Sequence, residues 1–252
     1  MYFRGMRKLK RELRNKILTL LLRIKKFKSE DSILIFSEAR GGSTWLLEML
    51  SNIPDTCINW EPLHVQEGVV PEKYGFGYKP SIQADFSEND YIKLFDEIHT
   101  FSRSTEWTRK YLTFRSLLIS KNVITKYVRA NRLLPFILKK FHFKYPPILL
   151  IRHPIDTCLS QVKAFRQDYL NEQIHDLLKR QRGHSSQRDT SRLCELNKVL
   201  AEKVERWCIN NVDTIKQVGS KDNITVVHYS ELLKDPETEL ERILERYDIK
   251  NK

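Results

Sequence analysis

Two segments of the sequence place arginine and hydroxyl side chains at spacings that suit the binding of phosphate groups. The first, Arg40-Gly-Gly-Ser-Thr44, follows a short apolar run and precedes an amphipathic segment. A glycine-containing turn that opens a helix offers backbone N–H groups and the positive end of the helix dipole to an anion. The second segment has Arg152 and, eight residues later, Ser160. A nucleotide phosphorylated at both its 3′ and 5′ ends requires two such oxyanion sites.

Each segment is also compatible with a plainer interpretation. The first segment is compatible with an ordinary glycine-containing strand–helix turn. In the second segment, Arg152 could form an ion pair with Asp156, and Ser160 could occupy a neutral position on a helix. The first segment is not a Walker A loop, because that motif has a lysine directly before its Ser or Thr. Arg40 is the sole cation of this turn, so a nucleoside triphosphatase is not indicated.

The segments that must position these residues alternate between strand and helix patterns. Short apolar runs predict strands over 32–36, 56–60, 122–128, 147–151 and 223–228. Longer amphipathic patterns predict helices near 45–50, 89–100, 107–120, 155–180, 192–218 and 236–247, with irregular or polar connections over 68–87 and 181–191. This alternation predicts an α/β fold with a parallel sheet. Ligands of such sheets bind at the carboxyl ends of the strands, where both phosphate-binding segments fall.

The positive charge of the chain is concentrated in an arm over residues 1–28, which precedes a predicted domain over 29–252. The arm holds eleven basic residues and one acid, whereas the whole chain has a formal net charge of +12, so the domain is nearly neutral. Apolar residues recur every three or four positions from Leu9 to Phe27, which predicts an amphipathic helix. Such a helix suits an anionic membrane surface. Packing on the domain with a solvated basic face is equally compatible.

Other sequence features narrow the class of protein. The arm has few aromatic residues for base stacking, so nucleic-acid binding is not expected. The four cysteines lie at no metal-ligand or disulfide spacing, and we expect no metal. No apolar run approaches the roughly 18 residues of a membrane span, and no signal peptide is evident. We expect a cytoplasmic protein. Its basic arm is compatible with peripheral attachment to the inner membrane surface.

Four segments together resemble the superfamily of sulfotransferases, which use 3′-phosphoadenosine 5′-phosphosulfate (PAPS) as donor. Residues 37–45 resemble its 5′-phosphosulfate loop, and residues 152–160 resemble its 3′-phosphate motif. Trp60-Glu-Pro-Leu-His-Val65 is similar to the Tyr-Glu-Pro-Leu-His-Val segment of carbohydrate sulfotransferases, and 228–236 resembles a segment near the end of the fold. The matches follow the order of the family over about residues 32–247. They imply a P-loop-NTPase-like parallel sheet flanked by helices, and transfer of a sulfuryl group to a hydroxyl, with a carbohydrate favoured as acceptor.

The resemblance assigns a role to each matching residue. It places Arg152 and Ser160 at the 3′-phosphate, and Trp45 and Tyr229 against the adenine, although both aromatic residues are also compatible with a place in the core. The residues implied at the 5′-phosphosulfate are Arg40, Gly41, Gly42, Ser43 and Thr44.

Glu61 is the predicted general base, because a carboxylate at the end of the second strand faces the loop after the first. A helix-capping or ion-paired carboxylate is the alternative, and His64 and His153 compete for the same role. Arg40 is expected to stabilise the leaving phosphate oxygen. Lys126 is expected to hold the sulfonate or the acceptor; a strand-end lysine reaching into solvent is its alternative.

The sequence departs from the family pattern at two places. Gly41 stands where many members have serine, and the sequence reaches Lys252 soon after Tyr229, where members usually continue into a loop covering the nucleotide. A second hypothesis therefore stays open: a catalytically silent nucleotide-binding or membrane-associated protein that retains the fold. The segments 61–120 and 163–218 are expected to shape the acceptor cleft, but their sequences do not identify the acceptor.

Overall fold

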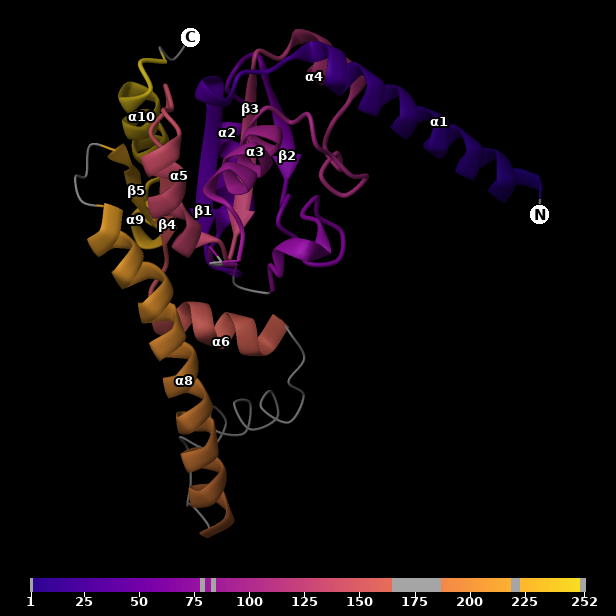
Figure 1. The fold of residues 1–252 in the computed structure, drawn as a ribbon. Coiled ribbons are helices and arrows are strands. Elements are labelled where there is room, and N and C mark those ends of the chain that lie inside the picture. Colours follow the sequence, from indigo (N-terminus) through magenta and orange to yellow (C-terminus); the bar gives the residue numbers. More distant parts are fainter. Residues whose placement is uncertain (1, 78–79, 83–84, 165–186, 219–222, 250–252) are drawn as a thin grey trace.

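The computed structural model describes residues 2–77, 80–82, 85–164, 187–218 and 223–249 (Figure 1). Within them a five-stranded sheet has the order β2-β3-β1-β4-β5, and all its strand pairs are parallel. Its strands are β1 (Ser32–Ser37), β2 (Thr56–Trp60), β3 (Asn122–Val128), β4 (Ile148–Ile151) and β5 (Thr225–His228). The predicted α/β fold with a parallel sheet is therefore confirmed.

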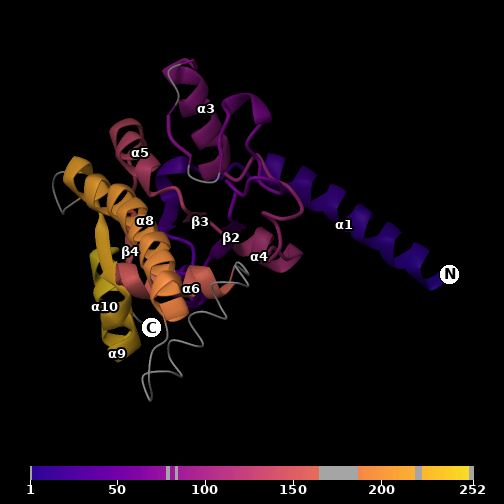
Figure 2. The same cartoon turned by 90° about the horizontal axis from the view of Figure 1, so that it is seen from below.

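The helices of the described residues follow the strands in the order expected of such a fold. They are α1 (Tyr2–Lys25), α2 (Ser43–Leu50), α3 (Glu88–His99), α4 (Phe114–Ile119), α5 (Leu134–Lys140), α6 (Pro154–Ala164), α8 (Gln187–Val218), α9 (Tyr229–Lys234) and α10 (Pro236–Arg246). Short 3-10 turns occupy Ser29–Asp31, Glu72–Tyr74 and Asn131–Leu133. Figure 2 shows α3 and α5 at the top of the view and α9 and α10 at the lower left, with the sheet between them.

Both faces of the sheet are covered, which is why its strands are continuous apolar runs. Successive residues of β1 point to opposite faces, so Ile33 and Ile35 join one core cluster while Leu34 and Phe36 join another. Helices α2 and α10 pack on the first cluster, and α3 and α5 on the second. Strand β1 lies between β3 and β4, which belong to opposite halves of the sheet. In such folds the ligand binds in the crevice at the carboxyl end of this central strand.

Most element boundaries match the sequence prediction, and the differences have local causes. The strand predicted at 147–151 begins at Ile148, because Pro147 has no N–H and instead accepts a bond from Thr225 N at its carbonyl. Residues 187–191, predicted as part of a polar connection, are the start of α8. The rest of that connection, and the predicted helix beyond Ala164, lie outside the described residues.

The predicted helix over 107–120 is wrong in its first half. The backbone there forms turns, and α4 begins only after Thr113, whose hydroxyl caps it by accepting from Ser116 N. Thr105 and Thr108 exchange bonds between their hydroxyls and each other's backbone N–H. These local bonds replace the helical ones, as threonine side chains commonly do. Two short helices, α5 and α9, were not predicted from the sequence.

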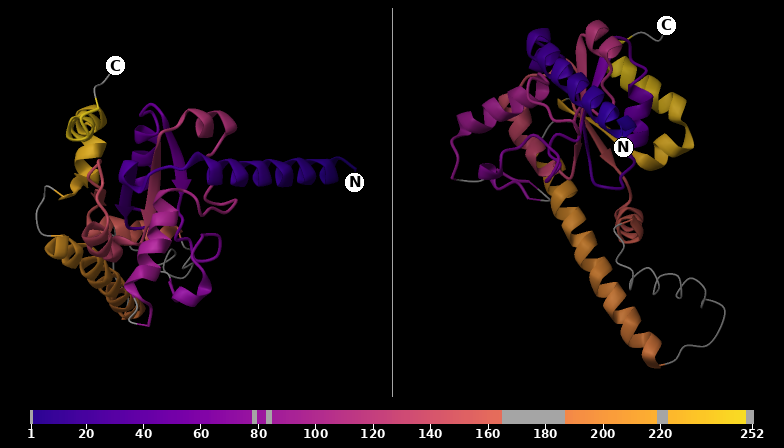
Figure 3. Two further views of the ribbon diagram at one scale, coloured as in Figure 1. Left: turned by 45° about the horizontal axis from the view of Figure 1, so that its top comes forward. Right: turned by 90° about the vertical axis from the view of Figure 1, so that its right-hand side faces the viewer.

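Helix α1 confirms the predicted periodicity and has two different faces. Leu18 and Leu22 are each only 1% exposed and pack with Phe101, Leu112 and Leu117 in a third core cluster. The apolar contacts of the arm with the domain therefore lie in its C-terminal half, and Arg11 pairs with Glu106 farther along the helix. The N-terminal end of the arm projects away from the sheet (Figure 3). None of the helices within the described ranges combines the length and apolar character needed to cross a bilayer.

His99, at the end of α3, is fully buried among aromatic rings. Its ring centroid lies 4.9 Å from that of Phe141 and 5.3 Å from that of Phe143, and its Nδ1 lies 3.2 Å from the Ser29 hydroxyl. Burial lowers the pKa of His99 from 6.5 to about 3, because this site disfavours the imidazolium.

Folding stability should therefore depend on His99 in acid. Above pH 6.5 both states hold the neutral ring, whereas between 6.5 and about 3 the unfolded chain binds the proton first. The stabilisation is lost on acidification at up to about 1.4 kcal/mol per pH unit. Between pH 8 and pH 5, the free energy of unfolding measured in urea should fall less for His99→Gln than for the wild type. The exposed His142→Gln is the control, and equal slopes for wild type and His99→Gln would contradict the assignment.

Candidate functional site

The loop between β1 and α2 has the geometry of an anion-binding turn. Its N–H at Gly41 bonds to the Glu38 carbonyl at 3.0 Å, and Gly42 caps α2 with φ 98°. Arg40 adopts φ 65°, a left-handed conformation that is uncommon for arginine, and the residue is exposed. The first turn of α2 begins at Ser43, so the N-terminal end of the helix faces the carboxyl edge of the sheet.

Both glycines of this loop are required by their surroundings. A Cβ at Gly42 would lie 2.4 Å from two ring carbons of Tyr229, at a backbone angle that side chains rarely adopt. A Cβ at Gly41 would lie 2.4 Å from the Ser37 hydroxyl oxygen and 2.8 Å from the Glu38 carbonyl oxygen. The serine that many relatives have at position 41 therefore does not fit this loop as it is built, which gives the departure from the family pattern a steric reason.

Three consecutive loop residues are each held by a different segment. Asn210 Nδ2 of α8 donates to Glu38 Oε1 at 2.8 Å, and Gln161 Nε2 of α6 donates to the Ala39 carbonyl at 2.9 Å. The guanidinium of Arg152, at the end of β4, donates from Nη1 to the Arg40 carbonyl at 3.0 Å. The loop is thus fixed by segments more than a hundred residues away.

Two of these anchors, Asn210 and Gln161, were missing from the sequence prediction. Asn210 and Gln161 lie within helices and belong to no recognisable motif. Glu38 is only 4% exposed, which is unusual for a carboxylate and marks it as a structural partner. Only the burial of Glu38 could have drawn attention to it, and burial is not visible in a single sequence.

The structure brings the two predicted phosphate-binding segments to one cavity of about 410 Å³ at the carboxyl edge of the sheet. Four cations and one carboxylate line it, so its charge suits a polyanion. The lining residues are Ala39, Arg40, Gly42, Ser43, Thr44, Trp45, Glu61, Lys126, Val128, Arg129, Arg152 and Tyr229.

Two predicted residues lie just behind this lining. Ser160 accepts a bond from Arg40 Nε at 3.2 Å, so it reaches the cavity through Arg40, and Gly41 of the loop is buried. Among the described residues, the competing histidines do not line the cavity: His64 packs on Trp107 with ring centroids 4.8 Å apart, and His153 is exposed.

Lys126 and Glu61 form an ion pair at the floor of the site. The register pairs Lys126 of β3 with Trp60 of β2, which brings its side chain beside Glu61. The Nζ atom lies 3.0 Å from Glu61 Oε1, 2.9 Å from Thr44 Oγ1 and 3.6 Å from the centroid of the Trp60 ring. Burial lowers the pKa of Lys126, and the carboxylate of Glu61 opposes that effect.

This arrangement resolves two of the alternatives raised by the sequence. Lys126 does not reach into solvent, because its side chain is only 2% exposed. Glu61 is ion-paired, as one alternative held, yet it still lines the cavity and is 20% exposed. Its backbone has φ 40°, a left-handed conformation that is uncommon for glutamate.

Tyr229 links the loop to Arg152. Its ring lies against Gly42, 6.1 Å from Trp45 between ring centroids, and 4.7 Å from the guanidinium carbon of Arg152. In the described structure Arg152 bonds to the Arg40 carbonyl rather than to Asp156, and its Nε is buried with no hydrogen-bond partner among the described residues. A buried donor of this kind is a feature that an anion would satisfy.

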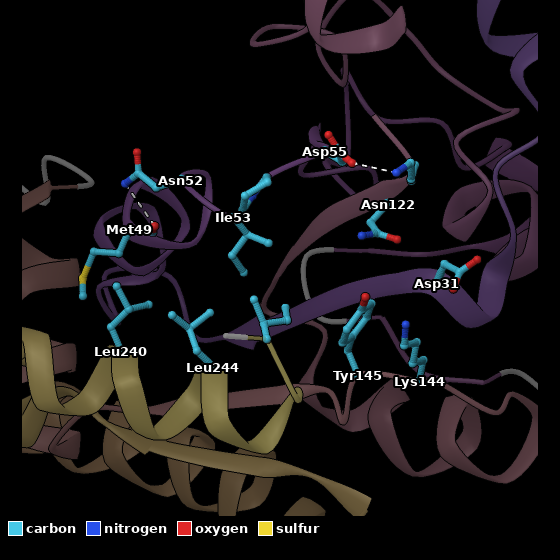
Figure 4. A pocket seen from close by; sticks show the side chains of 13 residues that line it. Asp31, Met49, Asn52, Ile53, Asp55, Asn122, Lys144, Tyr145, Leu240 and Leu244 are labelled. Atoms are coloured by element: carbon cyan, nitrogen blue, oxygen red, sulfur yellow. Dashed lines mark hydrogen bonds and ion pairs between the residues drawn. The ribbon is translucent and has the colours of Figure 1, made fainter. Parts of the chain in front are cut away.

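A larger cavity, of about 610 Å³, lies at the opposite edge of the sheet, where β1 and β3 begin (Figure 4). Its charged groups balance, since Asp31 and Asp55 accompany Lys121 and Lys144, and Asp55 and Lys121 are already paired at 3.0 Å. It contains none of the residues singled out by the sequence, and its charge does not suit a polyanion. Within the described residues no group of three or more His, Cys, Asp or Glu side chains is placed to hold a metal ion.

Comparison with known proteins defines the class. The sequence model of the sulfotransferase family matches residues 32–251, so this chain belongs to the sulfotransferase family. No curated protein matches the chain.

Among solved structures, this chain is similar to mouse sulfotransferase SULT7A1 complexed with PAP, at 13% identity and a TM-score of 0.43 over 88% of this chain and 61% of that one. A sulfotransferase from Alicyclobacillus acidocaldarius shares 15% identity with a TM-score of 0.39, over 87% of this chain and 81% of that one. The sulfotransferase domain from the curacin biosynthetic pathway shares 15% identity with a TM-score of 0.44, over 87% and 74% of the two chains. This chain thus spans less than two thirds of the mouse protein.

Substitution of Gly42 tests the contact between the loop and Tyr229. Gly42→Ala should weaken binding of adenosine 3′,5′-bisphosphate at least tenfold in calorimetry, because the new methyl group displaces the Tyr229 ring and strains the loop. Gly75→Ala is the matched control, since Gly75 also has positive φ but nothing lies within 4 Å of its added Cβ. Equal losses of affinity in the two variants would show that the Tyr229 contact is unimportant.

Proposed function

We propose that this chain transfers a sulfuryl group from PAPS to a hydroxyl of an acceptor. The observation that carries the proposal is that Arg40 and Arg152, from two separate phosphate-binding segments, line one cavity with a strong excess of cations. Membership of the sulfotransferase family supports sulfuryl transfer in general. The volume of about 410 Å³ falls in the range of small-molecule sites.

The residues of this cavity fit the donor. In our proposal the loop and first turn of α2, with Ser43 and Thr44, hold the 5′-phosphosulfate. Arg152, which has a buried donor without a partner among the described residues, binds the 3′-phosphate together with Ser160. Tyr229 and Trp45 flank the adenine, a role that their exposure to the same cavity supports.

Glu61 is the proposed general base. It accepts the proton of the acceptor hydroxyl as that oxygen forms a bond to sulfur. The bond from sulfur to the bridging oxygen breaks, and its electron pair stays on the departing 5′-phosphate. Arg40 offsets the charge that develops on this phosphate.

Lys126 supplies the lysine that the loop itself lacks. The loop has no lysine before Ser43, but Lys126 of β3 reaches Thr44 at 2.9 Å and so stands where the transferred group would lie. Because it also pairs with Glu61 at 3.0 Å, it links donor and base. When Glu61 takes up a proton, the charge opposing the fall in the pKa of Lys126 disappears, which favours release of a lysine proton toward the leaving phosphate.

A carbohydrate is the proposed acceptor. This part of the proposal rests on the resemblance of the Trp60–Val65 segment to a segment of carbohydrate sulfotransferases. The aromatic rings next to Glu61 support it. The Trp60 ring lies 4.9 Å from Tyr111 and 6.5 Å from Trp107 between centroids, and Tyr111 is exposed. Trp60 is only 6% exposed, so Tyr111 offers the exposed ring of this group, and such a ring packs well against the apolar face of a sugar ring.

The test is transfer of ³⁵S from labelled PAPS to a panel of glycans. Glu61→Gln should lower the turnover number roughly 100-fold or more, because proton removal from the acceptor is lost. It should leave the affinity for adenosine 3′,5′-bisphosphate within about twofold, since Arg40, Arg152 and the loop, which hold the two phosphates in our proposal, are unchanged.

Glu67→Gln, an exposed carboxylate in the same segment, is the control and should behave as the wild type. Near-normal turnover in Glu61→Gln would remove Glu61 from the mechanism. A wild-type chain that binds the bisphosphate yet transfers no label to any acceptor would instead support a catalytically silent nucleotide-binding protein.

A further inference from the structure

Helix α1 has an exposed apolar face that is separate from the face it packs on the domain. The inner face holds Leu18 and Leu22, which are buried in the third core cluster. The outer face is a continuous stripe that lies within an arc of about 80° at 100° per residue. Its exposed residues are Met6, Leu9, Leu13, Ile17, Leu20 and Ile24. Leu9 is 67% exposed although it has the same chemistry as Leu18, which is 1% exposed.

Cations flank this stripe. Lys16 and Arg23 are exposed along one edge of the stripe, and Lys10 is exposed along the other. Other cations of α1 are used for docking instead: Arg14 and Lys25 donate to the carbonyls of residues 112 and 118 at 2.8 and 2.7 Å. The helix therefore attaches to the domain on one side and presents an apolar, positively charged surface on another.

The pattern of charges disfavours a second copy of this chain as the partner. In a coiled-coil seam with Met6, Leu13 and Leu20 at one core position and Ile17 and Ile24 at the other, Lys10 would enter the core and Lys16 and Arg23 would flank it. The flanking positions hold no acidic residue that could pair with these cations in a second copy. Residues 2–25 also contain nine basic residues and one acid, so two such helices repel each other.

We propose that α1 binds the surface of an anionic lipid bilayer and lies in its plane. Leu9, Leu13, Ile17, Leu20 and Ile24 enter the boundary of the acyl chains, and Lys16 and Arg23 contact the anionic headgroups. An apolar stripe bordered by cations is complementary to such a surface. The buried Leu18 and Leu22 keep the domain attached, so the domain is held at the membrane. This proposal is independent of the proposed enzymatic activity.

The test uses the full chain, because removing α1 would uncover the third core cluster. In sedimentation with vesicles, the wild type should bind mixtures of phosphatidylcholine and phosphatidylserine and bind phosphatidylcholine alone much less. The double variant Leu13→Gln with Leu20→Gln should lose binding at least about tenfold, because two apolar groups no longer leave water. Lys16→Gln with Arg23→Gln should weaken binding and reduce its dependence on salt.

Leu233→Gln is the matched control, since Leu233 of α9 is 63% exposed, close to the 59% of Leu20, and should leave binding unchanged. Unchanged melting temperatures would confirm that the variants fold. Equal binding by the wild type and the Leu13→Gln, Leu20→Gln variant would overturn the proposal. A wild type that binds neither kind of vesicle would also overturn it. So would a stripe variant with a lower mass in solution than the wild type in the absence of lipid, because the stripe would then contact a second copy of the chain.

Discussion

The site depends on the fixed conformation of the loop between β1 and α2. A loop that binds anions with its backbone must be held open before the ligand arrives, since ordering it on binding would cost affinity. Here the carboxylate of Glu38 and the carbonyls of Ala39 and Arg40 each accept a side-chain hydrogen bond from a different segment. These bonds tie the loop to α8, α6 and the end of β4, so the far elements of the fold determine its shape.

Electrostatic balance is the second constraint on the site. A lysine that is only 2% exposed requires a compensating charge, and Glu61 provides it at 3.0 Å. The pair leaves the cavity with a net excess of cations from Arg40, Arg129 and Arg152. Positive charge is thus retained in the cavity in which we propose that the donor binds, and the carboxylate of Glu61 stays partly exposed in the same cavity. Placement of the pair follows from the register of β2 and β3.

The sequence predicts those features that are encoded locally. Apolar runs predicted the parallel strands, and the spacing of glycine, arginine and hydroxyl residues singled out the two segments that meet in one cavity. Features set by distant contacts were not predictable. Asn210 is 172 residues from Glu38, and the Lys126–Glu61 pair depends on strand register. The predicted helix over 107–120 failed because hydroxyls of Thr105 and Thr108 compete for the backbone, an effect that average propensities do not capture.

In the proposed mechanism, one nucleotide spans both arginine-containing segments of the cavity. Calorimetry of the full chain with adenosine 3′,5′-bisphosphate and with adenosine 5′-monophosphate tests it directly. We expect the 3′-phosphate to tighten binding by roughly tenfold to a hundredfold, because it gains charge-assisted hydrogen bonds with Arg152. Equal affinities for the two nucleotides would contradict it, since Arg152 would then contribute nothing to recognition of the 3′ end.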